Sequence, residues 1–83
     1  MKKVLKFSLE YFILSTKSKQ LYRDFTRTIE KVSDQSSKRE LHYSIRESFE
    51  SNRKITDEAH MRILIKDGYE QLKLLRKNLN LTE

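Results

Sequence analysis

The sequence predicts an all-α fold, an antiparallel three-helix bundle with a short N-terminal lead-in, on three observations. Strong helix formers are abundant among the 83 residues, and only one Gly and no Pro interrupt them. Apolar side chains recur at steps of three and four along three stretches, which is the period of one helix face. Short polar segments separate these stretches, as between antiparallel helices. The length suits one domain over residues 1–83.

The first helix is expected over about residues 9–32. Ser8 is its predicted N-cap. Its buried face is predicted from a row at helical spacing that comprises Leu14, Ser18, Leu21, Phe25, Ile29 and Val32. Ser15 and Thr16 mark an expected weak point between a leading turn and the main helix. The polar linker 33–36 then connects this helix to the second one.

The second helix is expected over about residues 37–52. Ser37 and Glu40 have the spacing of a capping box, in which each side chain satisfies a free backbone N–H group. The apolar face of this helix is predicted from Leu41, Ile45 and Phe49, which are four residues apart.

The third helix is expected over about residues 57–79, with Thr56 as its N-cap. Asp57 and Glu58 are placed favourably against the positive end of the helix dipole. The apolar row comprises Met61, Leu64, Ile65, Gly68, Leu72, Leu75 and Leu79. A domain of this size buries only about 60% of its extended-chain surface, so we expect a partner to contribute to its stability.

The composition excludes most classes of enzyme. The chain has no Cys, which rules out disulfides, thiol chemistry and cysteine-ligated metal centres. His42 and His60 fall on different predicted helices with no carboxylate pattern around them, so neither is predicted to bind a metal. No paired carboxylates or nucleophile–base arrangement stands out. The longest uncharged apolar run, 11–14, is far too short for a transmembrane segment. We expect a protein that is not an enzyme and holds no metal.

The positive charge is concentrated in the first predicted helix and the residues before it. The chain has a formal charge of +6, and residues 1–33 hold eight bases against three acids. Lys19, Arg23, Arg27 and Lys31 follow one another at spacing four, which predicts a basic stripe beside the apolar face. Such a stripe suits an acidic partner: a nucleic acid, an anionic membrane or an acidic protein.

Two of these partners fit the sequence less well. In a helix-turn-helix protein the third helix would read DNA, yet here residues 56–83, which contain that helix, have no net charge. A membrane segment is suggested by three lysines among apolar residues, namely Lys2, Lys3 and Lys6 with Val4, Leu5, Phe7 and Leu9. That segment is short and contains no Trp.

An ordered set of motifs adds a more specific indication. Leu21-Tyr22-Arg23 on the first helix is followed by Arg46 and Phe49 on the second, with Asn52 just after them. This set resembles the mitochondrial LYR-motif family (complex I LYR-like proteins). The resemblance extends over nearly the whole chain, because the segments 8–12, 55–58 and 65–73 look like those of one branch of that family.

The resemblance implies a fold, a partner and a cellular role. Members of this family are small three-helix adaptors of the mitochondrial matrix. They bind the mitochondrial acyl carrier protein, whose acyl-4′-phosphopantetheine arm inserts between the three helices. The chain would need no cofactor of its own. The resembling branch is associated with respiratory complex I.

Two groups of residues are expected to serve that role. Docking of the acidic carrier is assigned to Lys19, Tyr22, Arg23, Arg27, Lys31 and Arg46, because cationic side chains, Arg above all, bind carboxylates and phosphates. A channel for the acyl chain is assigned to Leu21, Phe25, Ile29, Ile45, Phe49, Leu64 and Gly68. From spacing alone, Phe25, Ile45 and Phe49 fit an ordinary core better than a lipid channel, and the resemblance is what favours the channel. Gly68 equally fits close helix packing, and Arg46 an ion pair with Glu50.

The expected function is therefore that of a non-enzymatic mitochondrial adaptor, which binds acylated acyl carrier protein and supports the assembly or activity of complex I. The alternative is a permanent structural subunit of a respiratory complex or mitoribosome that carries acyl carrier protein. A nucleic-acid-binding helical domain is the third interpretation.

Overall fold

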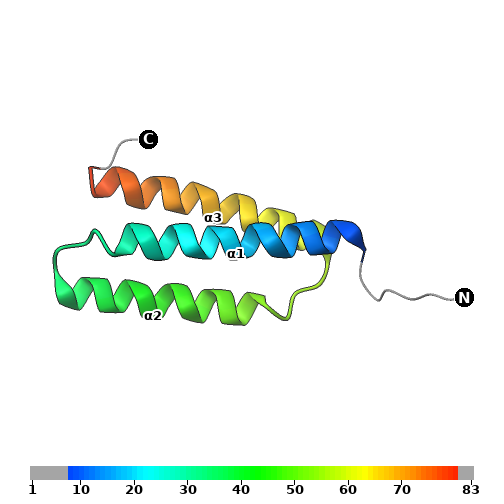
Figure 1. The fold of residues 1–83 in the computed structure, drawn as a ribbon, viewed down its shortest axis with the longest axis horizontal. Coiled ribbons are helices and arrows are strands. Elements are labelled where there is room, and N and C mark those ends of the chain that lie inside the picture. Colours follow the sequence, from blue (N-terminus) through cyan, green and yellow to red (C-terminus); the bar gives the residue numbers. More distant parts are fainter. Residues whose placement is uncertain (1–7, 81–83) are drawn as a thin grey trace, which may run out of the picture.

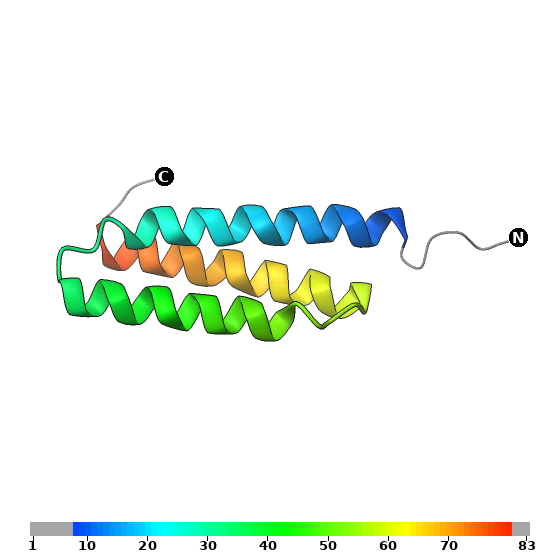
Figure 2. The same cartoon turned by 60° about the horizontal axis from the view of Figure 1, so that its bottom comes forward.

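A computed structural model describes residues 8–80 of the chain. Within that range it contains three helices and no strand: α1 (Leu9–Ile29), α2 (Gln35–Asn52) and α3 (Glu58–Asn78). The helices run up, down and up (Figures 1 and 2), and in the view of Figure 1 α1 lies between α2 and α3, both of which contact it. The predicted all-α three-helix bundle is confirmed. The expected N-terminal lead-in falls on residues 1–7, outside the described part of the chain.

The first helix begins where the sequence predicts and ends earlier. Ser8 is the N-cap, and its hydroxyl oxygen accepts a hydrogen bond from the backbone N–H of Tyr11 at 3.1 Å. The helix runs without interruption through Ser15 and Thr16, where a weak point was expected. It ends at Ile29 because the chain then tightens: the N–H of Lys31 donates to the carbonyl of Thr28 at 3.0 Å, a turn rather than a helical bond.

The predicted caps of the other two helices are wrong. Asp34, not Ser37, caps α2, and its carboxylate accepts hydrogen bonds from the Ser37 N–H at 2.9 Å and the Ser37 hydroxyl at 2.7 Å. Asp57, not Thr56, caps α3 and accepts from the His60 N–H at 3.1 Å. In both cases a carboxylate lies near the hydroxyl that was predicted. The charged oxygen is the stronger acceptor beside a positive helix end.

The core is built around α1. Six apolar side chains are buried: Leu14, Leu21, Phe25, Ile29, Val32 and Leu72. Five of them come from α1 or the turn after it, and one comes from α3. None of the 18 residues of α2 is buried, although Ile45 and Phe49 pack half-buried against the central cluster. In residues 8–80, no Cα atom of α2 comes within 8 Å of one in α3. Both outer helices therefore pack mainly on α1, and their backbones stay apart from each other.

Polar contacts near both ends of α3 join that helix to α1. Glu10 on α1 pairs with Arg62 on α3 at 3.0 Å. Toward the other end, the Arg76 Nε donates to the Thr28 hydroxyl at 3.4 Å. The Ser8 hydroxyl also hydrogen-bonds the carboxylate of Glu58, which ties the first turns of the two helices together.

Glu30, the C-cap of α1, joins that helix to α2. Its carboxylate contacts the His42 Nε2 at 2.8 Å and the Lys38 Nζ at 3.7 Å. The hydrogen bond with His42, and then the charge of Lys38, lower the pKa of Glu30 from its ordinary value. Glu30 and His42 are twelve residues apart in sequence, and the turn after α1 brings them together.

Candidate functional site

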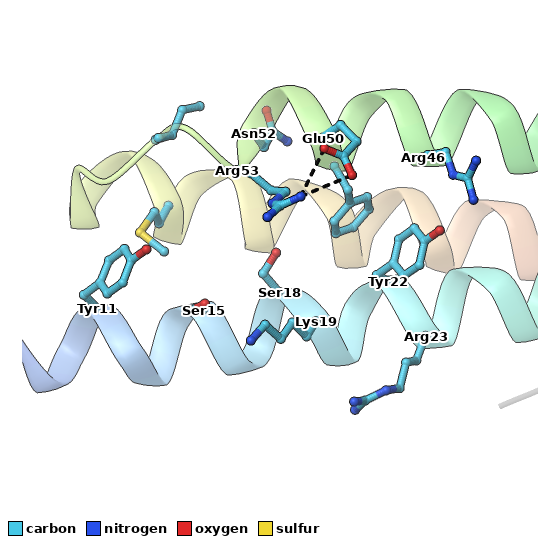
Figure 3. Close-up of a pocket in the computed structure, with 13 residues that line it drawn as sticks. Tyr11, Ser15, Ser18, Lys19, Tyr22, Arg23, Arg46, Glu50, Asn52 and Arg53 are labelled. Atoms are coloured by element: carbon cyan, nitrogen blue, oxygen red, sulfur yellow. Dashed lines mark hydrogen bonds and ion pairs between the residues drawn. The ribbon is translucent and has the colours of Figure 1, made fainter. Parts of the chain in front are cut away.

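Two hollows adjoin the middle of α1. The first, the outer hollow, has a volume of about 720 Å³ and lies between α1, the second half of α2 and the loop after it (Figure 3). Most of the residues that line it are polar or charged and come from α1, α2 and the C-cap of α2: Ser15, Ser18, Lys19, Tyr22, Arg23, Arg46, Glu50, Asn52 and Arg53. Apolar surface is contributed by Phe49, Ile55 and Met61, with Tyr11 at one end.

The second, the inner hollow, has a volume of about 200 Å³ and lies between α2 and α3 over α1. It exists because α2 and α3 are both held by α1 and do not close on each other. Its lining is mainly apolar or small, and comprises Ser18, Leu21, Phe25, Ile45, Ser48, Phe49, Asn52, Met61, Leu64, Ile65 and Gly68, with Asp67 and Gln71 among its polar members.

Phe49 is part of the wall that the two hollows share. Four residues line both of them, namely Ser18, Phe49, Asn52 and Met61. The Phe49 ring meets the Tyr22 ring edge to face, with centroids 5.1 Å apart, and meets Phe25 in the same manner at 6.3 Å. Tyr22 belongs to the outer hollow and Phe25 to the inner one. The Phe49 ring therefore lies where the basic outer hollow meets the apolar inner one.

Gly68 allows α3 to lie close to α1. A Cβ atom at this position would overlap Cδ2 of Leu21 and lie 3.6 Å from its Cγ. Leu21 is 2% exposed, so its side chain has little room to yield. Because Gly68 has no side chain, α3 leaves room for Leu21, the first residue of the Leu21-Tyr22-Arg23 motif. Both residues line the inner hollow.

Four of the six predicted docking residues come together. Lys19, Tyr22, Arg23 and Arg46 all line the outer hollow, where Tyr22 and Arg46 come from facing helices (Figure 3). Arg27 lies outside this hollow, and so does Lys31, which follows the end of α1. The basic rim is therefore shorter than the predicted stripe, and it includes a residue of α2.

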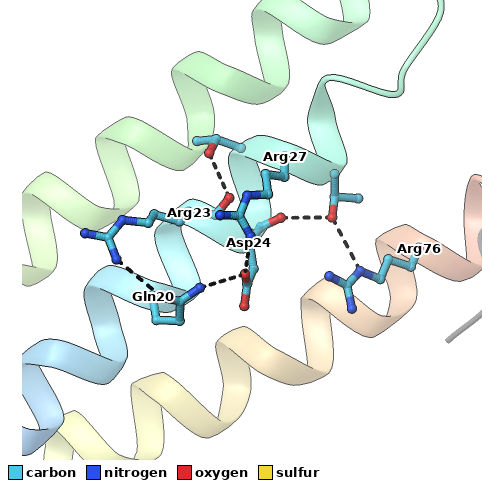
Figure 4. Close-up of polar contacts among 7 residues, drawn as sticks. Gln20, Arg23, Asp24, Arg27 and Arg76 are labelled. Carbon is cyan, nitrogen blue, oxygen red and sulfur yellow. Dashed lines mark hydrogen bonds and ion pairs between the residues drawn. The ribbon is translucent and has the colours of Figure 1, made fainter.

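An acid interrupts the basic row on α1. Asp24 accepts a hydrogen bond from the Gln20 Nε2 at 3.0 Å and lies 3.9 Å from an Arg27 Nη1 (Figure 4). Arg23 in turn donates to the Gln20 side-chain oxygen at 3.3 Å. Asp24 thus lies beside the bases that were expected to form a purely cationic stripe. The spacing of those bases alone does not reveal it. Positive charge at Arg27 is partly compensated, whereas Lys19 and Arg23 border the outer hollow.

Glu50 pairs with a different arginine from the one that spacing suggested. Arg53 donates to its carboxylate at 3.2 Å, from one turn further along α2 (Figure 3). The ion pair between Arg46 and Glu50, weighed in the sequence analysis, is absent from this part of the structure. Arg46 is exposed beside the outer hollow and can serve the basic rim.

Six of the seven predicted channel residues line the inner hollow: Leu21, Phe25, Ile45, Phe49, Leu64 and Gly68. Ile29 does not, because it lies one turn further along α1 and is fully buried at 0% exposure. Leu21 and Phe25 also belong to the central core cluster. Leu21 and Phe25 therefore serve both interpretations, because each is a core residue and also lines the inner hollow.

Ser18 and Met61 are members of the site that the sequence analysis placed only in apolar rows. Both line the two hollows at once. A signal for Ser18 was present, since a small polar residue interrupts an otherwise apolar row one turn before Leu21. Met61 carried no such signal. Its flexible side chain suits a wall of variable shape.

Neither a metal centre nor a membrane span is found in residues 8–80. No group of three or more His, Asp or Glu side chains in that range is arranged to hold a metal ion. The three helices found there are too polar to cross a bilayer. What the described chain does offer is a basic rim beside a small apolar hollow.

The fold and the two hollows define a small helical bundle with an apolar interior left open between its outer helices. The chain belongs to the LYR family: the family model described as "Complex 1 protein (LYR family)" matches residues 17–74, which include both hollows' main walls. Relatives named LYR motif-containing protein 2 match over most of their length. The protein from Danio rerio is 35% identical over 74 residues, covering 89% of this chain and 84% of its own. The protein from Homo sapiens is 34% identical over 76 residues, covering 92% and 86%. No solved structure gives a significant match.

Proposed function

We propose that this protein is a non-enzymatic adaptor of the mitochondrial matrix, which binds acylated acyl carrier protein and supports respiratory complex I. The observation that carries the proposal is the shared wall of the two hollows. A basic rim borders the outer hollow, and that hollow shares a wall, which includes the Phe49 ring, with the apolar inner one. Membership of a family described by complex I supports the assignment of the respiratory partner.

The basic rim suits an acidic carrier with a phosphodiester arm. Lys19 and Arg23 on α1 and Arg46 on α2 are exposed around one hollow. A guanidinium group can donate two parallel hydrogen bonds to a carboxylate or phosphate, which fixes orientation as well as affinity. The two arginines come from different helices, so a partner that engages both would hold α1 and α2 in one arrangement.

The inner hollow suits an acyl chain. Its apolar walls come from all three helices, and α2 contributes side chains that are only half-buried in the free protein. Each methylene group that moves from water into such a site gains about 0.8 kcal/mol. An inserted chain would therefore complete the burial of Ile45 and Phe49, which α1 and α3 leave unfinished.

Charge reversal tests the docking surface. The chain is co-expressed with acyl carrier protein, and co-elution is measured by size exclusion with intact mass of the eluted complex. We expect the variant Arg23→Glu/Arg46→Glu to lose most of the co-eluting carrier. The matched control Lys66→Glu/Lys73→Glu has the same net charge, changes two exposed bases of α3 outside both hollows, and should co-elute like the parent. Equal retention of carrier by both variants would contradict the basic rim.

A bulky substitution tests the inner hollow separately. Ser48 is exposed and lines that hollow from α2, whereas Ser51 is exposed on the same helix and lines neither hollow. Ser48→Phe should leave docking possible while lowering the fraction of carrier that bears a long acyl group, as read from intact mass. Ser51→Phe is the control and should retain the parent distribution. An unchanged acyl distribution in Ser48→Phe would refute insertion at this place.

The permanent subunit, the alternative drawn from the sequence, would use the same two hollows. Fractionation of native mitochondrial complexes separates the two roles. An assembly factor leaves the mature particle, whereas a subunit stays with it.

A further inference from the structure

Ser18 and Asn52 are the polar members of the wall that the two hollows share. Ser18 comes from α1 and Asn52 is the last residue of α2, and both side chains are half-buried. Within residues 8–80, neither side chain hydrogen-bonds another group of the protein. Their polar atoms therefore lie between a basic rim and an apolar hollow, at the place where the polar linkage of a ligand with an anionic head and an apolar tail would lie.

The charge of the two hollows sets the direction of such a ligand. The wall of the outer hollow contains one acid and four bases, namely Lys19, Arg23, Arg46 and Arg53. The acid, Glu50, is paired with Arg53 at 3.2 Å, and no carboxylate of residues 8–80 pairs with the other three bases. The inner hollow has one charged residue, Asp67. An anionic head group is therefore favoured in the outer hollow and repelled from the inner one.

Two helices give the same separation between the basic rim and the shared wall. Arg23 is five residues from Ser18 along α1, about 7.5 Å, and Arg46 is six residues from Asn52 along α2, about 9 Å. Both steps run in the same direction, because the two helices are antiparallel (Figure 3). A ligand whose anion contacts the two arginines therefore needs a polar segment of about this length before its apolar tail. A fatty acid has no such segment, since its carboxylate is joined directly to the alkyl chain.

We propose that the two hollows bind a free long-chain acyl thioester whose polar arm ends in phosphate, without a carrier protein. The phosphate contacts Arg23 and Arg46, the polar linkage lies at Ser18 and Asn52, and the acyl chain enters the inner hollow. The outer hollow, at about 720 Å³, is within the usual range of small-molecule sites, about 300–1,000 Å³. The inference rests on the proposed function in assigning the inner hollow to an acyl chain. Acyl-coenzyme A is a soluble compound of this chemistry.

Calorimetric titration tests the proposal on the full chain, purified free of carrier protein as verified by intact mass. The probes are palmitoyl-coenzyme A, coenzyme A and palmitate, all below the concentration at which micelles form. Palmitoyl-coenzyme A should bind with a dissociation constant at least about tenfold lower than either of the others, since each of them lacks part of the ligand. Thermal unfolding by circular dichroism is a second readout, because a ligand of the folded form raises its stability.

Two pairs of variants locate the ligand. Asn52→Leu removes the hydrogen-bonding group of the shared wall and should raise the dissociation constant of palmitoyl-coenzyme A about fivefold or more. Its control is Asn78→Leu, at an exposed residue of α3 that lines neither hollow. Arg23→Gln/Arg46→Gln should weaken binding about tenfold or more. Its control, Lys66→Gln/Lys73→Gln, removes two exposed bases of α3 outside both hollows. Both controls should stay within about twofold of the parent.

The proposal is overturned if the parent does not bind palmitoyl-coenzyme A, if palmitate binds as tightly, or if either test variant binds like its control. These results are independent of the co-elution with acyl carrier protein. A chain that retains the carrier but does not bind palmitoyl-coenzyme A contradicts only this inference. A chain that binds palmitoyl-coenzyme A but not the carrier contradicts only the proposed function.

Discussion

Replacing Gly68 by Ala tests whether the close approach of α3 to Leu21 sets the packing of the bundle. A methyl group at this position would overlap Cδ2 of Leu21, a side chain only 2% exposed. Extra atoms in a packed core cost about 1–3 kcal/mol, whereas Ala in place of Gly inside a helix gains about 1 kcal/mol. The free energy of unfolding, measured by urea denaturation with circular dichroism, should therefore fall by about 0–2 kcal/mol.

A second substitution separates the two effects. Leu21→Ala alone should lower the free energy of unfolding by about 2–5 kcal/mol. In that background the overlap is gone, so Gly68→Ala should instead stabilise by about 1 kcal/mol. The double-mutant cycle then gives a coupling of about 1–3 kcal/mol. Lys66→Ala, exposed on the same helix, is the control and should stay within about 0.5 kcal/mol. If Gly68→Ala stabilises both backgrounds equally, Leu21 does not pack against Gly68 and the reasoning is refuted.

Three further substitutions probe the core, the partition between the hollows and a cap. Ile29→Ala, at a side chain with 0% exposure, should cost about 2–5 kcal/mol in urea unfolding, and a cost under about 1 kcal/mol would argue against its burial. Phe49→Ala removes a half-buried ring and its edge contact with Tyr22. It should cost about 2 kcal/mol, whereas no measurable loss would mean that the ring does not pack against Tyr22 and the central cluster. Asp34→Asn keeps a capping oxygen but removes the charge. Hydrogen bonds from the Ser37 hydroxyl and N–H hold the pKa of Asp34 below its ordinary value. The ionised cap therefore stabilises the fold above the pKa of the unfolded chain, and this stability is lost as pH falls through the lowered pKa. An acid titration of the unfolding midpoint should be flatter for Asp34→Asn than for the parent, and identical titrations would contradict this role.

The buried face of α1 was predictable from spacing. Leu14, Leu21, Phe25, Ile29 and Val32 were expected in one row, and all five are buried. The prediction succeeds because α1 packs against a helix on two sides, so its apolar row meets partners along its whole length. The caps were less predictable. At the starts of α2 and α3 a carboxylate and a hydroxyl lie within three residues, and residue preference alone does not decide between them.

The two hollows were not predictable from the sequence. Helical spacing tells which side chains share a face, but it does not give the distance between two helices. The apolar row of α2 was expected to be buried, yet Ile45 and Phe49 stay half-buried because α3 does not approach α2. Charge pairing was ambiguous for a similar reason. Glu50 is within one turn of both Arg46 and Arg53, and only the structure assigns it to Arg53.

The open arrangement of α2 connects the stability of this fold to its occupancy. α2 is held to α1 by the Glu30 contacts near its start and by the Phe49 ring near its end. Between these two attachments, Ile45 is only half-buried against the central cluster and also lines the inner hollow. An isolated bundle of this size has little stability in reserve, and unburied apolar surface on α2 reduces it further. A ligand that binds only the folded form adds stability in proportion to its concentration and affinity. An acyl chain that fills the inner hollow would therefore also hold α2 in place. The free bundle is then less stable than the bundle with the acyl chain bound.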